Sequence, residues 1–311
     1  MLEQEFRLIP LLVNDGITNM AIDESILIAR SENKVPNTIR FYKWNPSTAS
    51  IGRNQSVSRE INLDTAKRYN VDIVRRISGG GAVYHDKENE ITYMVVINEQ
   101  ELKQIFDRVK YSLYDKNGLN IKQNPMAIDS FLPDEEIESN NVKNLNEIYE
   151  KKNGENSIFN IENSYHVITM GLVKGLELLG IKIDQGVIHC PALFINKRKI
   201  SGNAQARRNN TILQHGTILL KVDPEFMYTI LKAPEGVPVK RMVASVRAKV
   251  CGIFDCIKPL KDNELVEYFI AGFEKALNIK CKLGTLTDYE LKLVEEIKQK
   301  RKNNDWINRI P

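Results

Sequence analysis

The chain has 311 residues, of which 42% are hydrophobic and 27% are charged, a composition typical of a soluble globular protein. The formal net charge of +4 is too small for a typical nucleic-acid-binding surface, and no apolar run reaches the roughly 18 residues of a membrane span. Four cysteines in so long a chain do not form a disulfide framework, so a reduced, cytoplasmic location is expected.

The first hundred residues alternate between strand and helix patterns. Apolar residues with helical spacing predict an amphipathic helix at 19–30, and β-branched, alternating runs predict the strands around it. These strands are expected at 1–12, 37–44, 47–55, 71–76 and 90–98, with a short helix at 62–70. The last two strands flank a run of glycines, which suggests a strand–glycine turn–strand unit.

Residues 101–163 interrupt this pattern. They begin with a helix pattern at 101–114 and continue into a long stretch rich in Asn, Glu and Lys, which predicts a polar insertion that is partly flexible. Regular patterns resume afterwards: a helix that starts at 164 and ends at Gly180, a hairpin at 193–203, a strand at 211–222, and helices near 224–232, 263–277 and 288–302.

Strands and helices follow one another without a regular βαβ period. We therefore expect the α+β class: a mixed, largely antiparallel sheet with helices on one face, in a single domain covering residues 1–311.

The sequence "RRISGGGAVYHD", which starts at Arg75, contains the first candidate site. Three consecutive glycines lose much backbone entropy on folding, so they indicate either a tight turn or a close approach of a ligand to the backbone. Backbone N–H groups in such a turn can bind an anion, and arginines beside it can contact phosphate or carboxylate groups.

A second candidate lies in "NKRKISGNAQARRNNTILQHGTILL". Lys199 precedes Ser201 and Gly202 there, and His215 and Thr217 lie on the following strand. A solvated basic hairpin is the alternative interpretation of these residues taken alone. Cys251 and Cys256 are too isolated from other ligand types to indicate a zinc site, and no metal ligands are assigned.

Together, "RRISGGGAVYHD", "KISGNAQ" and "LQHGTILL" make the chain resemble the lipoate–protein ligase A family, within the biotin/lipoate A/B protein ligase superfamily. "NMAIDES", "IGRNQS" and "SVRAKV" also match that family's pattern. The resemblance covers residues 5–100 and 160–310. It implies a mixed sheet flanked by helices, related to the catalytic core of biotin ligases and class II tRNA synthetases.

The resemblance also implies roles for individual residues. Lys199 matches the family's essential lysine, which contacts the carboxylate and the phosphate of the reactants. The residues implied to bind an acyl-adenylate are Arg76, Ser78, Gly79, Gly80, Gly81, Ala82, His85, Asn89, His215 and Thr217.

These roles imply an ATP-dependent lipoate–protein ligase. ATP, Mg²⁺ and lipoate would give lipoyl-AMP, with Lys199 stabilising the negative charge between the two anions. The lipoyl group would pass to a lysine of a lipoyl domain, on a 2-oxoacid dehydrogenase subunit or the glycine cleavage H protein. Many ligases of this family continue into an accessory domain, so a separate accessory ligase subunit is expected as a partner. No nucleic acid or membrane partner is expected.

One departure from the family supports a different reaction. Pro191 and Ala192 stand where the family usually carries an Asn-Asp pair, and Cys190 beside His189 precedes them. Related octanoyltransferases use a cysteine near this point to form an acyl thioester. The alternative is therefore a cysteine-dependent octanoyl or lipoyl transferase, with Cys190 as nucleophile, acyl carrier protein as donor and no ATP. A second alternative is a non-catalytic carrier-binding protein on the same fold.

Overall fold

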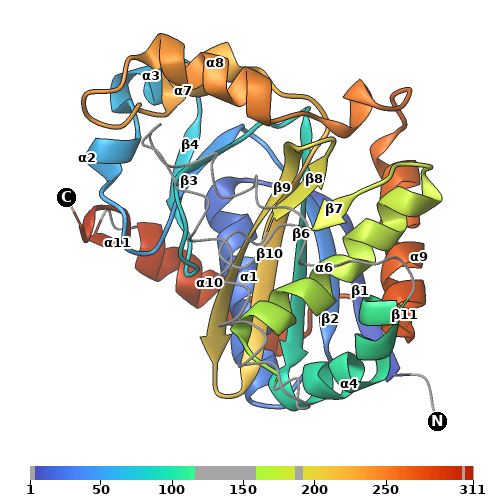
Figure 1. Ribbon diagram of the computed structural model, residues 1–311. Coiled ribbons are helices and arrows are strands. Elements are labelled where there is room, and N and C mark those ends of the chain that lie inside the picture. Colours follow the sequence, from blue (N-terminus) through green and yellow to red (C-terminus); the bar gives the residue numbers. More distant parts are fainter. Residues whose placement is uncertain (1–3, 116–158, 186–191, 303–304, 311) are drawn as a thin grey trace, which may run out of the picture.

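The computed structural model describes residues 4–115, 159–185, 192–302 and 305–310. These residues form one large mixed sheet, helices on both of its faces, and a smaller sheet beside it (Figure 1). Most of the predicted insertion and the candidate nucleophile Cys190 lie outside the described residues.

The large sheet has eight strands in the order β11–β1–β2–β6–β10–β9–β8–β7. Only β1 makes parallel pairs, with β11 and β2, so the predicted mixed, largely antiparallel sheet is confirmed. The strands are β1 (Gln4–Asn14), β2 (Thr38–Trp44), β6 (Glu90–Asn98), β7 (Asp184–Gln185), β8 (Ala192–Ile195), β9 (Arg198–Arg208), β10 (Thr211–Leu219) and β11 (Ile279–Leu283).

Helices cover both faces of this sheet, so the expectation of helices on one face is wrong. All seven residues of β2 are buried, with Phe41 in one core and Tyr42 in the other. A strand that is apolar on both sides requires a helical layer on each side. One layer is α1 (Gly16–Ser31) with α10 (Asp288–Lys302), and the other is α4 (Glu99–Asp115), α6 (Ile161–Leu178) and α9 (Asp262–Leu277).

The beginning of the predicted insertion belongs to the second of these cores. Leu102, Ile105 and Phe106 on α4 are fully buried against α6 and the sheet. Residues 101–106 therefore contribute to the folded core.

The smaller sheet has the order β4–β3–β5 and carries the glycines. Its strands are β3 (Thr48–Ile51), β4 (Asp72–Arg75) and β5 (Val83–His85), packed against α2 (Val57–Glu60), α3 (Leu63–Arg68) and α7 (Pro224–Ile230). β3 lies between the two strands that flank the glycines, so they do not pair with each other. The predicted strand–turn–strand unit is therefore corrected: β6, the strand expected to return, lies in the large sheet.

Two helices near the C-terminus were not predicted: α8 (Val239–Lys249), which lies across α7 at the top of Figure 1, and α11 (Asp305–Asn308), which packs against β4. None of the helices in the described parts of the chain is long and apolar enough to cross a membrane.

Candidate active site

The glycine turn, residues 78–82, connects β4 to β5 in the smaller sheet. Within this turn only Gly80 has a left-handed backbone, with φ of +94°. Its carbonyl packs against Gly52, where an added Cβ would lie only 2.0 Å from the Gly80 carbonyl oxygen. Around Gly79 and Gly81, a Cβ would meet no atom of the described residues within 4 Å. Packing therefore requires glycine at 52 and the positive φ favours glycine at 80, whereas the space at 79 and 81 is not filled by the described residues.

Arg76 shapes this turn from inside the protein. Its guanidinium donates to the carbonyl oxygens of Gly79 (2.9 Å) and Gly81 (2.7 Å), and to the carbonyl and hydroxyl oxygens of Ser50. Burial lowers the pKa of Arg76 to about 10. Since these carbonyls are turned inward and no described residue accepts a hydrogen bond from the N–H groups of Gly79, Gly80 or Gly81, those donors remain available to an anion.

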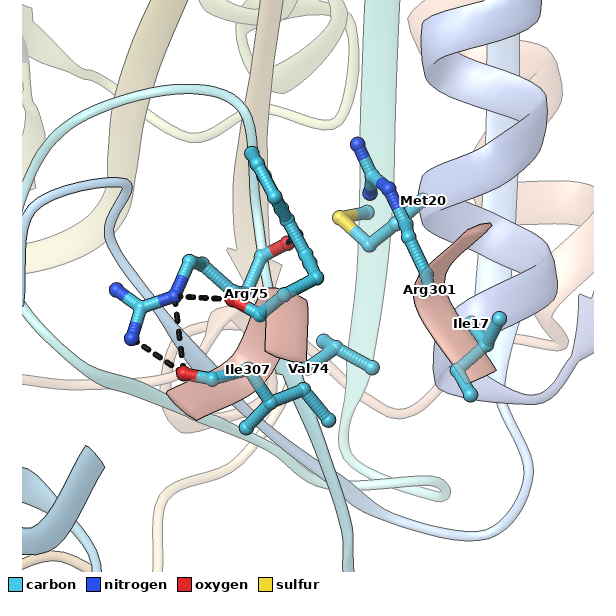
Figure 2. A pocket seen from close by; sticks show the side chains of 7 residues that line it. Ile17, Met20, Val74, Arg75, Arg301 and Ile307 are labelled. Atoms are coloured by element: carbon cyan, nitrogen blue, oxygen red, sulfur yellow. Dashed lines mark hydrogen bonds between the residues drawn. The ribbon is translucent and has the colours of Figure 1, made fainter. Parts of the chain in front are cut away.

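Arg75 joins the glycine-bearing strand to the C-terminal helix. Its side chain is 1% exposed and donates to the carbonyls of Trp306 and Ile307 (Figure 2). It also donates to the Gln55 carbonyl at 2.6 Å. The cavity beside it measures only about 10 Å³, which is too small for a substrate. Arg75 therefore has a structural role.

A buried chain of polar groups connects the glycine turn to the large sheet. The Ser78 hydroxyl lies 2.6 Å from Nε2 of His215, and His215 Nδ1 lies 3.0 Å from an Asp23 carboxylate oxygen on α1. Asp23 also accepts hydrogen bonds from Arg40 (2.7 Å) and Tyr42 (2.9 Å). Ser78, His215 and Asp23 are 5% exposed or less, so this relay fixes the turn and does not itself meet solvent.

His85 belongs to a second buried relay of the same type. Its Nε2 lies 2.7 Å from the Ser50 hydroxyl and its Nδ1 lies 2.7 Å from Glu90, while its ring stacks on Trp44 at 4.2 Å between centroids. The neighbouring Asn89 side chain donates to Asp86. The resemblance implied that His85 and Asn89 contact the ligand, but the structure engages both side chains in contacts within the protein.

Lys199 lies on the large sheet, near the start of β9. Its ammonium group lies over Gly202, where an added Cβ would come within 3.2 Å of Nζ, and it has no partner among the described residues. The N–H of Gly202 donates to the Thr217 hydroxyl at 3.1 Å on β10, two residues from His215. Strand β10 thus connects the Lys199 side of the site to the glycine turn.

The remaining predicted site residues are Ala82 and Thr217. Ala82 is half-buried against the core of the smaller sheet, and Thr217 is 8% exposed. Asp23, which lies within "NMAIDES", was not predicted from the sequence to belong to the site. A carboxylate among the apolar residues on the buried side of a helix was the available signal, since such a group requires a partner.

Comparison with known proteins identifies the family. Residues 15–115 and 141–274 match the family model described as "Lipoyl protein ligase A/B catalytic domain". "Octanoyltransferase LipM" of Brevibacillus brevis is 32% identical, covering 93% of each chain, and that of Clostridioides difficile is 31% identical, covering 94% of each.

Solved structures of more distant sequence share the fold. "Crystal structure of lipoate-protein ligase A bound with ATP" has a TM-score of 0.70 at 21% identity and covers 97% of this chain and 98% of the other. The bipartite ligase of Thermoplasma acidophilum also has a TM-score of 0.70, at 22% identity, covering 97% and 96%. This confirms the predicted ligase-type catalytic fold.

The relatives correct the expected reaction. Those at 30% identity or more carry the name octanoyltransferase, so the expectation of an ATP-dependent lipoate ligase, with ATP, Mg²⁺ and a lipoyl-adenylate, is wrong. The sequence features that favoured it, the glycines and Lys199, are compatible with either reaction because both handle an activated acyl group. Membership in a family of enzymes also argues against the non-catalytic alternative. The chain belongs to the lipoyl protein ligase A/B catalytic-domain family.

Proposed function

We propose that this protein is an octanoyltransferase that moves an octanoyl group from a thioester on an acyl carrier protein to a lysine of a lipoyl-type carrier domain. The observation that carries this proposal is the name shared by the relatives, which match along 93% or more of the chain. The Lys199 ammonium and the N–H groups of the glycine turn, which have no partner among the described residues, support it, because acyl transfer develops negative charge on oxygen and sulfur.

Cys190 is the proposed nucleophile. Covalent connectivity supports this choice: Cys190 is two residues from Ala192, which pairs with Gly202 beneath the Lys199 ammonium. Two residues span at most about 7 Å, and the proposal is that Cys190 acts close to the strand that carries Lys199. A nearby cation favours the thiolate, which is the reactive form of cysteine.

The other cysteines are less suited to this role. Burial raises the pKa of Cys251 to about 11 and that of Cys281 to about 12, so both thiols stay protonated near neutral pH. Cys256 is exposed on a loop and serves as a control.

The reaction has two acyl transfers. The Cys190 thiolate attacks the donor thioester carbonyl, the bond to the carrier sulfur breaks, and that sulfur leaves as a thiolate and takes up a proton. The neutral amine of the acceptor lysine then attacks the acyl-cysteine, forming an amide; the Cys190 thiolate leaves, and the amine proton is released. Glycine-turn N–H groups would stabilise the carbonyl oxygen in each step.

Intact-protein mass spectrometry after incubation with octanoyl-acyl carrier protein, without ATP, tests this proposal. We expect an octanoyl adduct on the wild type and on Cys256→Ser, and none on Cys190→Ser, because serine ionises far less readily. An adduct that persists in Cys190→Ser would reject the nucleophile. Transfer that occurs only with ATP would reject the transferase itself.

A further inference from the structure

Helix α8 presents an exposed face whose charges are all positive. None of its eleven residues is buried, and the helix holds Lys240, Arg241, Arg247 and Lys249 without an acidic residue. The exposed positions include Lys240, Arg241, Ala244, Arg247 and Ala248, which follow the i, i+1, i+4, i+7, i+8 spacing of one helix face. This face, called here the basic face, has cations towards both ends and the small Ala244 between them.

The basic face is costly to the helix itself. Lys240 and Arg241 lie in the first turn, where the helix dipole disfavours cations, and that turn contains no acid. Neither side chain forms an ion pair with a described residue. Residues that oppose local preference without a compensating contact in the protein are expected where a partner supplies that contact.

Helix α8 also ends beside the candidate active site. Val250, the residue after α8, pairs with Lys199 as a parallel β-bridge, and the Cys251 N–H donates to the Lys199 carbonyl at 3.0 Å. Figure 1 shows α8 extending from the β8–β9 end of the large sheet across the top of the molecule. A partner held on α8 therefore lies along a helix whose C-terminal end adjoins Lys199.

We propose that the basic face of α8 is the docking surface for the acyl donor, an acyl carrier protein with an acidic surface. This inference rests on the proposed transferase reaction, which supplies the donor. Charge complementarity selects an acidic partner and gives it a fast, salt-sensitive association.

The length of α8 favours the acyl donor over the acceptor domain as the partner that binds the basic face. Lys240 lies ten residues before Val250, about 15 Å along the helix axis at 1.5 Å per residue. The four-carbon stem of an acceptor lysine cannot span that distance. An acyl group on the long, flexible prosthetic arm of a donor carrier can reach Lys199 while the carrier's body stays on the basic face.

The surroundings of α8 argue against a nucleic acid. Asp223, Glu225 and Asp255 line a groove of about 470 Å³ beside Arg247, and Glu225 forms an ion pair with Arg247. These carboxylates would repel a continuous phosphate backbone, whereas a folded acidic domain can contact the basic face and leave the groove open.

The test is the double variant Lys240→Glu/Arg241→Glu. Both side chains are exposed and acids are favoured in a first helical turn, so the variant should fold normally. We expect the Kd for holo-acyl carrier protein and the KM for octanoyl-acyl carrier protein to rise about tenfold or more, since attraction becomes repulsion. The kcat/KM for octanoyl-pantetheine, a donor without a carrier body, should stay at the wild-type value.

The matched control is Lys292→Glu/Lys300→Glu, which makes the same charge change at exposed positions of α10. Equal weakening in both variants would reduce the effect to net charge and overturn the proposal, as would unchanged affinity for the acyl carrier protein. A loss of affinity for the acceptor domain or for RNA, in place of the carrier, would also overturn it. Titration of each variant with holo-acyl carrier protein measures binding directly, so these outcomes can be distinguished even if neither donor supports transfer. Absence of transfer from both donors would reject the proposed function, which is a separate result.

Discussion

The two arginines before the glycine turn and Lys199 on β9 illustrate two uses of a cation in the candidate site. Arg75 and Arg76 are each buried, and their guanidinium groups are satisfied by backbone carbonyls and Ser50. Lys199 is half-buried, and its ammonium has no partner in the described part of the chain. The arginines hold the backbone in shape, whereas the lysine keeps its charge available for a reactant.

This difference follows from the chemistry of the side chains. A guanidinium presents five donors in a rigid plane, which suits the organisation of several carbonyls at once. An ammonium is a compact charge on a flexible stem and can follow a group as its charge changes. Function and stability should therefore separate when these residues are changed.

Lys199→Ala gives the largest expected effect. We expect kcat/KM for octanoyl transfer to fall by a factor corresponding to about 3 kcal/mol, because a charge is lost at a preorganised site. The midpoint of urea unfolding should not change, since no described contact is broken.

Arg198→Ala, the preceding residue on β9, is the control and should keep near-normal transfer, because its neighbour in the structure is Asp255 rather than the site. If both variants lost activity equally, the special position of Lys199 would be rejected.

Arg75→Met should show the opposite behaviour to Lys199→Ala, with a loss of stability as its main effect. Arg75→Met removes a buried donor from the carbonyls of Gly52, Arg53, Gln55, Trp306 and Ile307, so the free energy of unfolding should decrease by about 3 kcal/mol. Urea denaturation measures this change. Arg53→Met, at an exposed position nearby, should stay within about 0.5 kcal/mol of the wild type. A stable Arg75→Met protein with impaired transfer would assign Arg75 to the reaction instead.

A structural feature can be predicted from this sequence when the residues that determine it are neighbours in the chain. Strands such as β2 and β6 and helices such as α6 carry their own hydrophobic period, so they could be placed from the sequence. Helix α8 was missed although Val239, Met242, Val243 and Val246 follow the helical spacing of an apolar stripe; none of its residues is fully buried.

Contacts between distant residues were beyond the same reasoning. Ser78 is 137 residues from His215, and His215 is 192 residues from Asp23, so only the folded sheet brings them together. The family resemblance also grouped Arg76 and His85 with the glycines as ligand contacts. In the structure the Arg76 side chain donates to the Gly79 and Gly81 carbonyls of the turn, and the His85 side chain contacts Ser50 and Glu90.

The Ser78–His215–Asp23 relay offers a smaller, more specific test. His215→Phe removes the link between the glycine turn and Asp23, while Asp23 keeps Arg40 and Tyr42 as partners. We expect kcat/KM to fall about tenfold through a misplaced turn, and Ser78→Ala to do the same. If the two residues act as one relay, the double variant should be no worse than either single variant. Additive losses would show that each residue acts on its own.

The smallest expected effect distinguishes the glycines from one another. At Gly79 an added methyl group meets no atom of the described residues within 4 Å and the backbone is not left-handed, so Gly79→Ala should keep or slightly raise stability, by up to about 1 kcal/mol. Gly80→Ala must hold a φ of +94° and places its Cβ 3.2 Å from the Arg76 guanidinium, so it should lose about 1 kcal/mol of stability.

The KM for transfer should respond in the opposite order, with the larger change in Gly79→Ala. The methyl group of Gly79→Ala points into the space reserved for the donor and should raise the KM for octanoyl-pantetheine, whereas Gly80→Ala should affect KM only as far as the turn itself shifts. Thermal unfolding and initial rates on the same two variants measure both quantities. If Gly79→Ala left the KM unchanged, the open space at this turn would have no part in binding the donor.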